Sequence, residues 1–150
     1  MTNRPSKVMQ RLLKAANGLH VTLNRKSGSK FASQVANLPL LLLTTCARKT
    51  GRLHTNPVAY LRDGQDYLAA ASAGGMDWNP DWYFNLKSQP SATIQVGGQA
   101  LNVAAVITVG DERAHLYNRF KAASPNFVKY EQNASRIIPV IRLVPNGNNR

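Results

Sequence analysis

The chain has 150 residues, 43% of them hydrophobic, and a formal net charge of +12 at pH 7. This length fits one domain, since domains cluster at about 100–150 residues, and no apolar run reaches the roughly 20 residues that a membrane-spanning helix needs. The charge predicts anionic partners such as nucleic acid, acidic lipid or a phosphorylated small molecule. The single cysteine, Cys46, excludes an intramolecular disulfide, and no secretory signal is recognisable, so we expect a cytoplasmic protein.

The basic residues are concentrated towards the N-terminus, and no Asp or Glu precedes Asp63. Over residues 6–23, apolar side chains recur every three or four positions, which predicts an amphipathic basic helix. Residues 25–34 are polar and rich in serine, which predicts a connector. We therefore expect a basic helix and connector over 1–37 and a β-rich body over 38–150, together forming one domain.

From Leu38 onward, short apolar runs alternate with turn residues, as in the strands of a barrel or sandwich. The first run is too uniformly apolar for a half-exposed strand, and the next four runs form two predicted hairpins. Pro139 indicates an edge or a bulge in the last strand. About six strands with peripheral helices predict a mostly β, α+β protein built on a small antiparallel barrel. The strands are expected at residues 38–45, 57–61, 67–72, 93–96, 100–109 and 137–144.

Helices are predicted over residues 79–87 and 111–123, with a shorter helical or looped piece over 126–134. Asn79 is a candidate N-cap directly before Pro80 at the first helical position. Trp78, Trp82 and Leu86 are spaced to share one helical face, which is typical of core packing. The free backbone N–H groups of such a helix start also suit an anion.

A basic turn, Arg48-Lys49-Thr50-Gly51-Arg52, follows the first predicted strand. The fork of an arginine matches phosphate, lysine adds a mobile charge, threonine adds a hydroxyl, and glycine allows close backbone approach. The spacing differs from that of a P-loop, because the glycine and lysine positions do not match. Two interpretations stay open, an anion-binding cradle and an ordinary solvated hairpin tip.

Small residues are clustered at Ala70-Ala71-Ser72-Ala73-Gly74-Gly75, after a predicted strand. They leave room for a flat ring against the backbone, with Ser72 able to hydrogen-bond to it, although a small-residue turn with a bulge explains the segment equally well.

Conventional catalytic patterns are missing from the sequence. The histidines at positions 20, 54 and 115 lie in different predicted elements without close Cys or carboxylate companions, so no metal site is predicted. No nucleophile elbow or His-Glu-x-x-His pattern occurs either. An enzyme with this sequence would need a cofactor for its reactivity.

Four segments taken in order carry a resemblance to a known family. They are Leu-Leu-Thr-Thr-Cys-Ala-Arg-Lys-Thr-Gly-Arg at 42–52, Asn56-Pro57, Ala-Ala-Ser-Ala-Gly-Gly at 70–75, and Asn-Pro-Asp-Trp-Tyr-Phe-Asn-Leu at 79–86. With Arg-Ile-Ile-Pro-Val at 136–140, they resemble the deazaflavin-dependent nitroreductase family of actinobacteria, the coenzyme F420-dependent branch of the split β-barrel flavin-binding proteins.

The resemblance implies a split β-barrel that binds reduced coenzyme F420 and passes a hydride to a quinone or a nitroaromatic. It implies that Ser72 and Tyr130 act on the substrate, and that Arg48, Lys49 and Thr50 hold the phosphate and the polyglutamate tail. The other implied cofactor-binding residues are His54, Thr55, Asn56, Pro57, Val58, Ala59, Ala70, Ala71, Ser72, Ala73, Asp81, Trp82, Tyr83, Phe84, Asn85 and Phe127.

One departure concerns the acceptor. Where the best-known member of the family has several tyrosines, this chain has Ser124 and Phe127, and only Tyr130 keeps a phenol hydroxyl. Loss of the other hydroxyls favours quinones over nitroimidazoles as acceptors.

Several alternatives stay open. The fold also serves flavin mononucleotide, so the chain is alternatively a basic protein that binds this flavin or another anionic ligand without catalysis. Nucleic-acid binding explains the charge but not the small residues at 70–75, and is not favoured. The basic helix is a candidate for peripheral contact with an anionic membrane, and monomer and homodimer are both compatible with the sequence.

Overall fold

The structure, a computed structural model, describes residues 34–35 and 37–147. The predicted basic helix over 6–23 and nearly all of the connector over 25–34 lie outside these ranges. Seven strands and four helical segments follow one another along the described part. In chain order they are β1 (Gln34–Val35), β2 (Leu38–Cys46), β3 (Leu53–Asp63), β4 (Asp66–Ala70), η1 (Ala73–Gly75), α3 (Asp81–Ser88), β5 (Ser91–Val96), β6 (Gln99–Ile107), α4 (Gly110–Ala123), α5 (Asn126–Asn133) and β7 (Val140–Pro145).

The strands form one antiparallel sheet in the order β1-β2-β3-β4-β7-β6-β5, which an additional β2–β5 pairing closes into a barrel. Leu42 shows the closure, because it lies opposite Pro57 of β3 on one side and Gln95 of β5 on the other. The predicted antiparallel barrel is confirmed.

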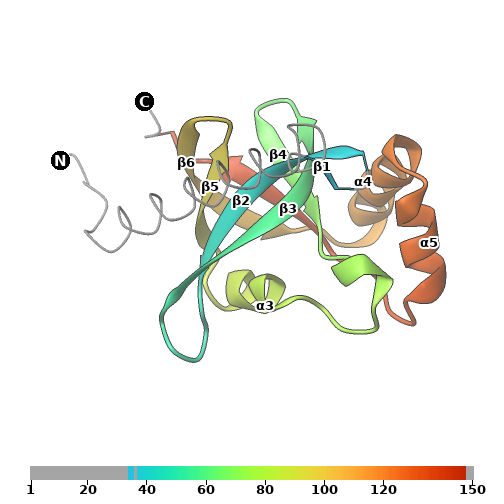
Figure 1. Ribbon diagram of the computed structural model, residues 1–150, viewed down its shortest axis with the longest axis horizontal. Helices are drawn as coiled ribbons and strands as arrows, with labels where there is room; N and C mark the ends of the chain where they lie inside the picture. The colour runs from blue at the N-terminus through green and yellow to red at the C-terminus, as the bar shows by residue number, and fades with distance from the viewer. Residues whose placement is uncertain (1–33, 36, 148–150) are drawn as a thin grey trace, which may run out of the picture.

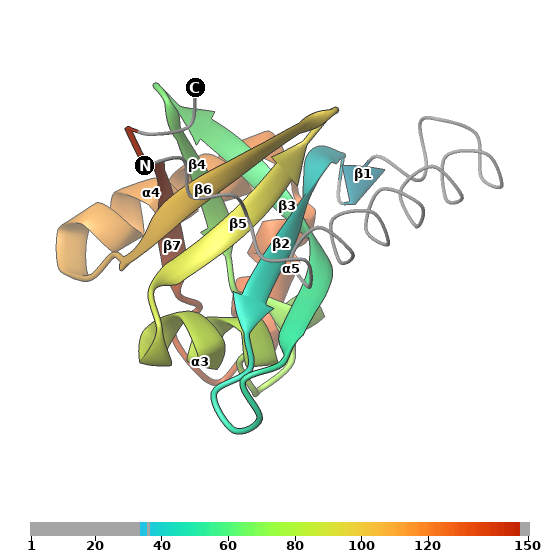
Figure 2. The same ribbon diagram turned by 90° about the vertical axis from the view of Figure 1, so that its left-hand side faces the viewer.

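Period-two alternation along β4 divides the core into two parts. Tyr67 and Ala69 belong to the cluster inside the barrel, whereas Leu68 and Ala70 belong to a cluster outside it. The inner cluster includes Leu86 of α3, so this helix packs against the inner core, and Figure 2 shows α3 across one end of the barrel. The outer cluster includes side chains of α4 and α5, and Figure 1 shows these two helices side by side against the barrel.

Strand β2 is buried on both faces over Leu41–Thr45, as its uniformly apolar sequence predicts. Both predicted hairpins are present, as β3–β4 and β5–β6. However, β3 begins at Leu53, earlier than the predicted Pro57, because the polar residues His54 to Asn56 continue the ladder with β2. β7 begins at Val140, so Pro139 lies just before the ladder, where its missing N–H costs no hydrogen bond.

Two details predicted for the first helix are wrong. Asn79 does not cap α3, because Pro80 is the N-cap residue and the Asn79 side-chain oxygen accepts a hydrogen bond from Arg136 instead. Trp78 does not share a buried helical face with Trp82, because it precedes the helix and is 63% exposed. The predicted helix over 111–123 is confirmed as α4, and the piece over 126–134 is helical, as α5.

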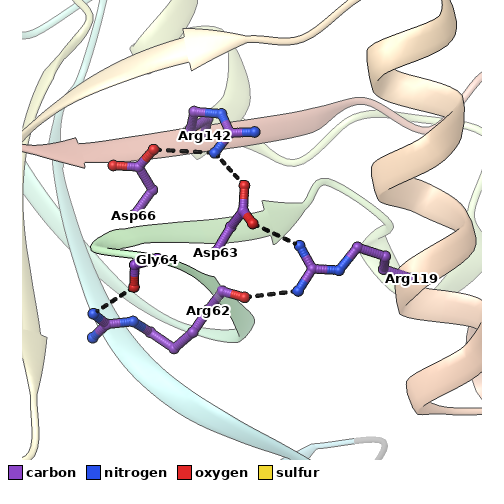
Figure 3. A network of polar contacts seen from close by, with 6 residues as sticks. All are labelled: Arg62, Asp63, Gly64, Asp66, Arg119 and Arg142. Carbon is purple, nitrogen blue, oxygen red and sulfur yellow. Dashed lines mark hydrogen bonds and ion pairs between the residues drawn. The ribbon is translucent and has the colours of Figure 1, made fainter.

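The turn of the β3–β4 hairpin is tied to the rest of the barrel by arginines (Figure 3). Arg142 of β7 donates to the carboxylates of Asp63 at 2.7 Å and Asp66 at 3.0 Å. Arg119 of α4 donates to Asp63 at 3.1 Å and to the carbonyl of Arg62 at 2.8 Å. Since Asp63 is paired twice, it connects β3 with both α4 and β7.

Candidate functional site

The β2–β3 turn extends beyond α3 at one end of the barrel (Figure 1). Its backbone is closed by hydrogen bonds between Ala47 and Arg52, at 2.7 Å, and between Gly51 and Ala47, at 2.8 Å. Gly51 has a φ of 72°, which suits glycine because it has no Cβ. The side chains of the turn are exposed, so a folded loop presents a concentration of positive charge.

Asn85 attaches this turn to α3. The residue is 3% exposed, and its amide oxygen accepts from the Arg48 backbone N–H at 3.2 Å and from the Arg48 guanidinium at 3.1 Å. Its amide nitrogen donates to the hydroxyl of Thr45 at 3.1 Å. Arg48 also contacts the carboxylate of Asp81 at 3.5 Å and lies over the ring of Phe84, 5.1 Å from its centroid. Arg48 is therefore held largely by α3.

A polar cavity of about 360 Å³ lies between the turn, β3 and α3. Among the cations at this turn, Lys49 and Arg52 have side chains that form no hydrogen bond or ion pair within the described residues. Lys49 lines the cavity and Arg52 follows it on the same turn. The lining residues are Ala47, Arg48, Lys49, Thr50, His54, Thr55, Asn56, Asp81 and Asn85.

A mostly apolar cavity of about 230 Å³ continues along the same two elements. Residues 54–56 of β3 line the polar cavity and residues 57–59 line the apolar one. Helix α3 contributes Asp81 and Asn85 to the polar cavity and Trp82 to the apolar one. The two cavities are therefore neighbours. The residues that line the apolar cavity are Leu40, Pro57, Val58, Ala59, Ala70, Ser72, Ala73, Gly74, Pro80, Trp82, Phe127 and Tyr130.

Small residues make one wall of the apolar cavity. Ala73 and Gly74, in η1, both have left-handed backbones, with φ of 46° and 64°. Gly75 follows with φ of 84°, and a Cβ added there would lie 2.9 Å from the Cα of Tyr130. The loop after β4 therefore lies directly against the backbone of α5, which only glycine allows at this position.

Arg136 holds this loop from the other side. Its guanidinium donates to the carbonyls of Met76 at 3.0 Å, Ala71 at 3.2 Å and Ser72 at 3.0 Å, and to the side-chain oxygen of Asn79. Burial lowers the pKa of Arg136 from its ordinary value. The sequence predicts no role for Arg136, which belongs to the segment over 136–140 that contributes to the family resemblance.

The structure brings most of the residues implied by the resemblance to the two cavities. Those at the polar cavity are Arg48, Lys49, Thr50, His54, Thr55, Asn56, Asp81 and Asn85, and those at the apolar one are Pro57, Val58, Ala59, Ala70, Ser72, Ala73, Trp82, Phe127 and Tyr130.

Three implied residues do not line either cavity. Ala71 and Tyr83 are buried in the inner core, and Phe84 lies beneath the guanidinium of Arg48. Gly74, from the predicted small-residue cluster, also lines the apolar cavity, whereas the lining residues Leu40, Ala47 and Pro80 are not predicted. Within the described ranges, no group of three or more His, Cys, Asp or Glu side chains is placed to hold a metal ion.

Comparison with known proteins identifies the family. The family model described as F420H(2)-dependent quinone reductase matches residues 17–145. The chain belongs to this family. An F420H(2)-dependent quinone reductase of Mycobacterium tuberculosis is 34% identical over 129 residues, which cover 83% of this chain and 87% of that protein. A second Mycobacterium tuberculosis protein, to which the same activity is assigned provisionally, is 39% identical over 108 residues, covering 72% of this chain and 91% of that one.

A solved structure of an F420-H2-dependent reductase shares the fold of this quinone reductase family member. It is 32% identical, with a TM-score of 0.64 over 70% of this chain and 93% of that chain. A structure described as a domain-swapped dimer is 28% identical, with a TM-score of 0.65 over 89% of this chain and 98% of that chain. The expected split β-barrel and the resemblance to the F420-dependent family are both confirmed.

Proposed function

We propose that the protein is an oxidoreductase that uses reduced coenzyme F420 to reduce a quinone. The observation that carries this proposal is the pair of neighbouring cavities, one cationic and one lined mostly by apolar side chains. This division matches a cofactor that has a flat ring at one end and a phosphate with a carboxylate tail at the other. The names of the two mycobacterial relatives support the same activity.

The polar cavity suits the phosphate and the tail. Lys49 and Arg52 have free charges among the described residues, and the hydroxyl of Thr50 lies on the same turn. Arg48 is already paired with Asn85 and Asp81, so we assign it mainly to shaping the turn and secondarily to direct contact with the anion. Charge-assisted hydrogen bonds to phosphate are stronger than neutral ones, which favours this end as the anchor.

The apolar cavity suits the ring. Ala59, Ala70 and Ala73 have small side chains that leave space for a flat aromatic system, and Trp82 and Phe127 supply aromatic walls. When bound, coenzyme F420 supplies a hydride, which is two-electron chemistry that no side chain of this site provides. The protein's own contribution is to bind, to orient and to keep water away from the ring.

Ser72 and Tyr130 supply the hydroxyl groups among the residues that line the apolar cavity. We assign them to orienting the acceptor and to donating hydrogen bonds to negative charge that develops on its oxygen. Ser124 is fully buried and does not line the cavity, and Phe127 has no hydroxyl. The site thus offers few donors to a nitro group, so we propose quinones rather than nitroimidazoles as the preferred acceptors.

The activity is tested by mixing the purified protein with reduced coenzyme F420 and the soluble quinone menadione, in the absence of oxygen. We expect the absorbance of oxidised coenzyme F420 to return only when protein and quinone are both present. Replacing the cofactor with reduced flavin mononucleotide or NADH is expected to give no enzyme-dependent turnover. Equal turnover with reduced flavin mononucleotide would instead support the alternative, a flavin-binding relative.

Ser72→Ala tests the role of the serine. We expect kcat to fall about tenfold with menadione, with the affinity for the cofactor unchanged, because the lost hydrogen bond acts on the acceptor. The control is Ser88→Ala, an exposed change at the end of α3. Unchanged turnover of both quinones and nitroaromatics by Ser72→Ala would remove Ser72 from the mechanism.

We also propose that the basic N-terminal segment contacts anionic membrane lipid, where quinones are dissolved, and that the protein is otherwise cytoplasmic. The positive charge before Asp63 supports this proposal. Among residues 34–35 and 37–147, no helix is long and apolar enough to cross a membrane. Liposomes with anionic lipid should retain the protein at low salt and release it at high salt, and lack of retention would contradict the proposal.

For the chain's organisation we propose one domain, with the basic segment over 1–37 joined to the barrel body over 38–150. We propose that one chain forms the whole site, since a single chain lines both cavities. Light scattering at the concentration of the assay would then give the mass of a monomer at full activity. Activity confined to a dimer would contradict this.

A further inference from the structure

The loop over residues 71–79 connects β4 to α3 and supplies Ser72, Ala73 and Gly74 to the apolar cavity. Two backbone hydrogen bonds form within it, from the Gly75 N–H to the Ser72 carbonyl at 2.8 Å and from the Met76 N–H to the Ala73 carbonyl at 3.3 Å. Ala73 has a left-handed backbone, which is strained for any residue with a Cβ. A strained conformation persists only where surrounding contacts hold it, so other parts of the protein must fix this loop.

Arg136 makes most of those contacts. Its guanidinium reaches the carbonyls of Ala71 and Ser72 at the start of the loop, the carbonyl of Met76 in its middle, and the side chain of Asn79 at its end. A planar fork with several donors can serve these acceptors together, whereas the compact ammonium of a lysine cannot. One side chain therefore fixes the loop along its whole length.

Helix α5, which precedes Arg136 in the chain, supplies another part of the cavity wall. Asp77 of the loop accepts hydrogen bonds from the backbone and hydroxyl of Ser135, both at 2.8 Å, next to Arg136. Gly75 lies against Tyr130 of α5, and Tyr130 lines the cavity together with Phe127. The loop and α5 are thus held together beside the ring site, because Arg136, in the segment that follows α5, is hydrogen-bonded to the loop.

Arg136 does not itself line the cavity, so it would act through the carbonyls that it holds. We propose that Arg136 is a positioning residue that sets the separation between the 71–79 loop and α5, and thereby the affinity of the apolar cavity for a flat ring. This inference rests on the proposed function, since the ring is that of the cofactor. It predicts that the loss of Arg136 weakens binding of the ring, not of the tail.

The test compares Arg136→Lys with Arg113→Lys. Arg113 of α4 is a matched control, because it donates to the carbonyl of Ile138 at 2.8 Å and lies 4.7 Å from the centroid of the Tyr117 ring, without lining the cavity. Dissociation constants are measured for oxidised coenzyme F420 and for the deazaflavin nucleoside that lacks its phosphate and tail. We expect Arg136→Lys to weaken both by the same factor, about tenfold or more, and Arg113→Lys to change neither.

Hydrogen exchange of the protein without ligand gives a second readout. The amides of Gly75 and Met76 should exchange about tenfold faster in Arg136→Lys and at the wild-type rate in Arg113→Lys. Asn79→Ala, which removes one contact and keeps the arginine, should shift binding and exchange in the same direction by less, and it serves as the test if Arg136→Lys does not fold. Each variant's Tm is measured alongside.

Two results would overturn the inference. The first is that Arg136→Lys and Asn79→Ala both bind the ring and exchange their amides as the wild type does. The second is that Arg113→Lys loses as much ring affinity as Arg136→Lys at the same change in Tm. Failure of the proposed function looks different, because the wild-type protein would then bind neither deazaflavin. In that case the exchange rates still decide whether Arg136 holds the loop.

Discussion

Lys49 and Arg48 are neighbours on the β2–β3 turn, yet their surroundings give them different tasks. Arg48 is hydrogen-bonded to Asn85, contacts Asp81 and lies over Phe84, whereas the ammonium of Lys49 has no partner among the described residues. A charge without a partner is available to a ligand at little cost. The free lysine is therefore the better candidate for direct contact with an anionic tail.

Lys49→Ala is predicted to weaken binding of coenzyme F420 about tenfold, since loss of one charge-assisted contact at a partly exposed site costs about 1.4 kcal/mol. It should leave binding of the tail-less deazaflavin nucleoside unchanged and reduce the salt dependence of binding. Lys87→Ala, an exposed charge removal on α3, is the control. An equal loss for both ligands would show that Lys49 does not act on the tail.

For single residues, the sequence indicates where a site lies better than it indicates the role of each residue. The charges at 48–52 and the small residues at 70–75 indicate a ligand-binding site, because charge and size are properties of the residue types themselves. The roles of Asn79, Asn85 and Arg136 depend on partners that are distant in the chain, such as Thr45 for Asn85. No local pattern contains that information.

The β3–β4 hairpin shows how charged groups fix one element against two others. The hydrogen bond from Arg142, more than the contact with Arg119, holds the pKa of Asp63 below its ordinary value of 3.8. A lowered pKa in the folded state means that Asp63 stabilises the fold above pH 3.8. This contribution is lost as the pH falls through the folded-state pKa.

Asp63→Asn is therefore predicted to lower Tm at pH 7, and the difference from wild type should narrow as the pH falls below about 4. Thermal unfolding of both proteins between pH 7 and pH 3 measures this. Ser88→Ala, an exposed neutral change at the end of α3, is the control and should keep the wild-type Tm across the range. A constant difference between Asp63→Asn and wild type across the range would contradict the argument.

The elements themselves follow from the sequence where apolar periodicity is strong. The uniformly apolar β2 and the two glycine-containing hairpins are predicted correctly, because burial on both faces and tight turns leave clear patterns. The start of β3 is not predicted correctly, because His54 to Asn56 line the polar cavity and show no apolar alternation. The prediction that Trp78 lies on a helical face is wrong for a related reason. Trp78 belongs to the loop before α3, which is held by Arg136 and is not helical.

Over the whole molecule, a net charge of +12 alone predicts only that something acidic binds. The fold makes the prediction more specific. The basic turn lines the polar cavity, and β3 and α3, which line that cavity too, also line a second cavity with mostly apolar walls. Nucleic acid would use the charge but leave the apolar cavity empty. A small cofactor with an anionic tail uses both.

The most direct measurement is a titration of the purified protein with oxidised coenzyme F420, flavin mononucleotide and duplex DNA under the same salt conditions. We expect saturable binding of one coenzyme F420 per chain, with a dissociation constant on the order of micromolar, about −8 kcal/mol, and weaker binding of the other two ligands. Tighter binding of flavin mononucleotide or of DNA would contradict the assignment of the two cavities to a deazaflavin.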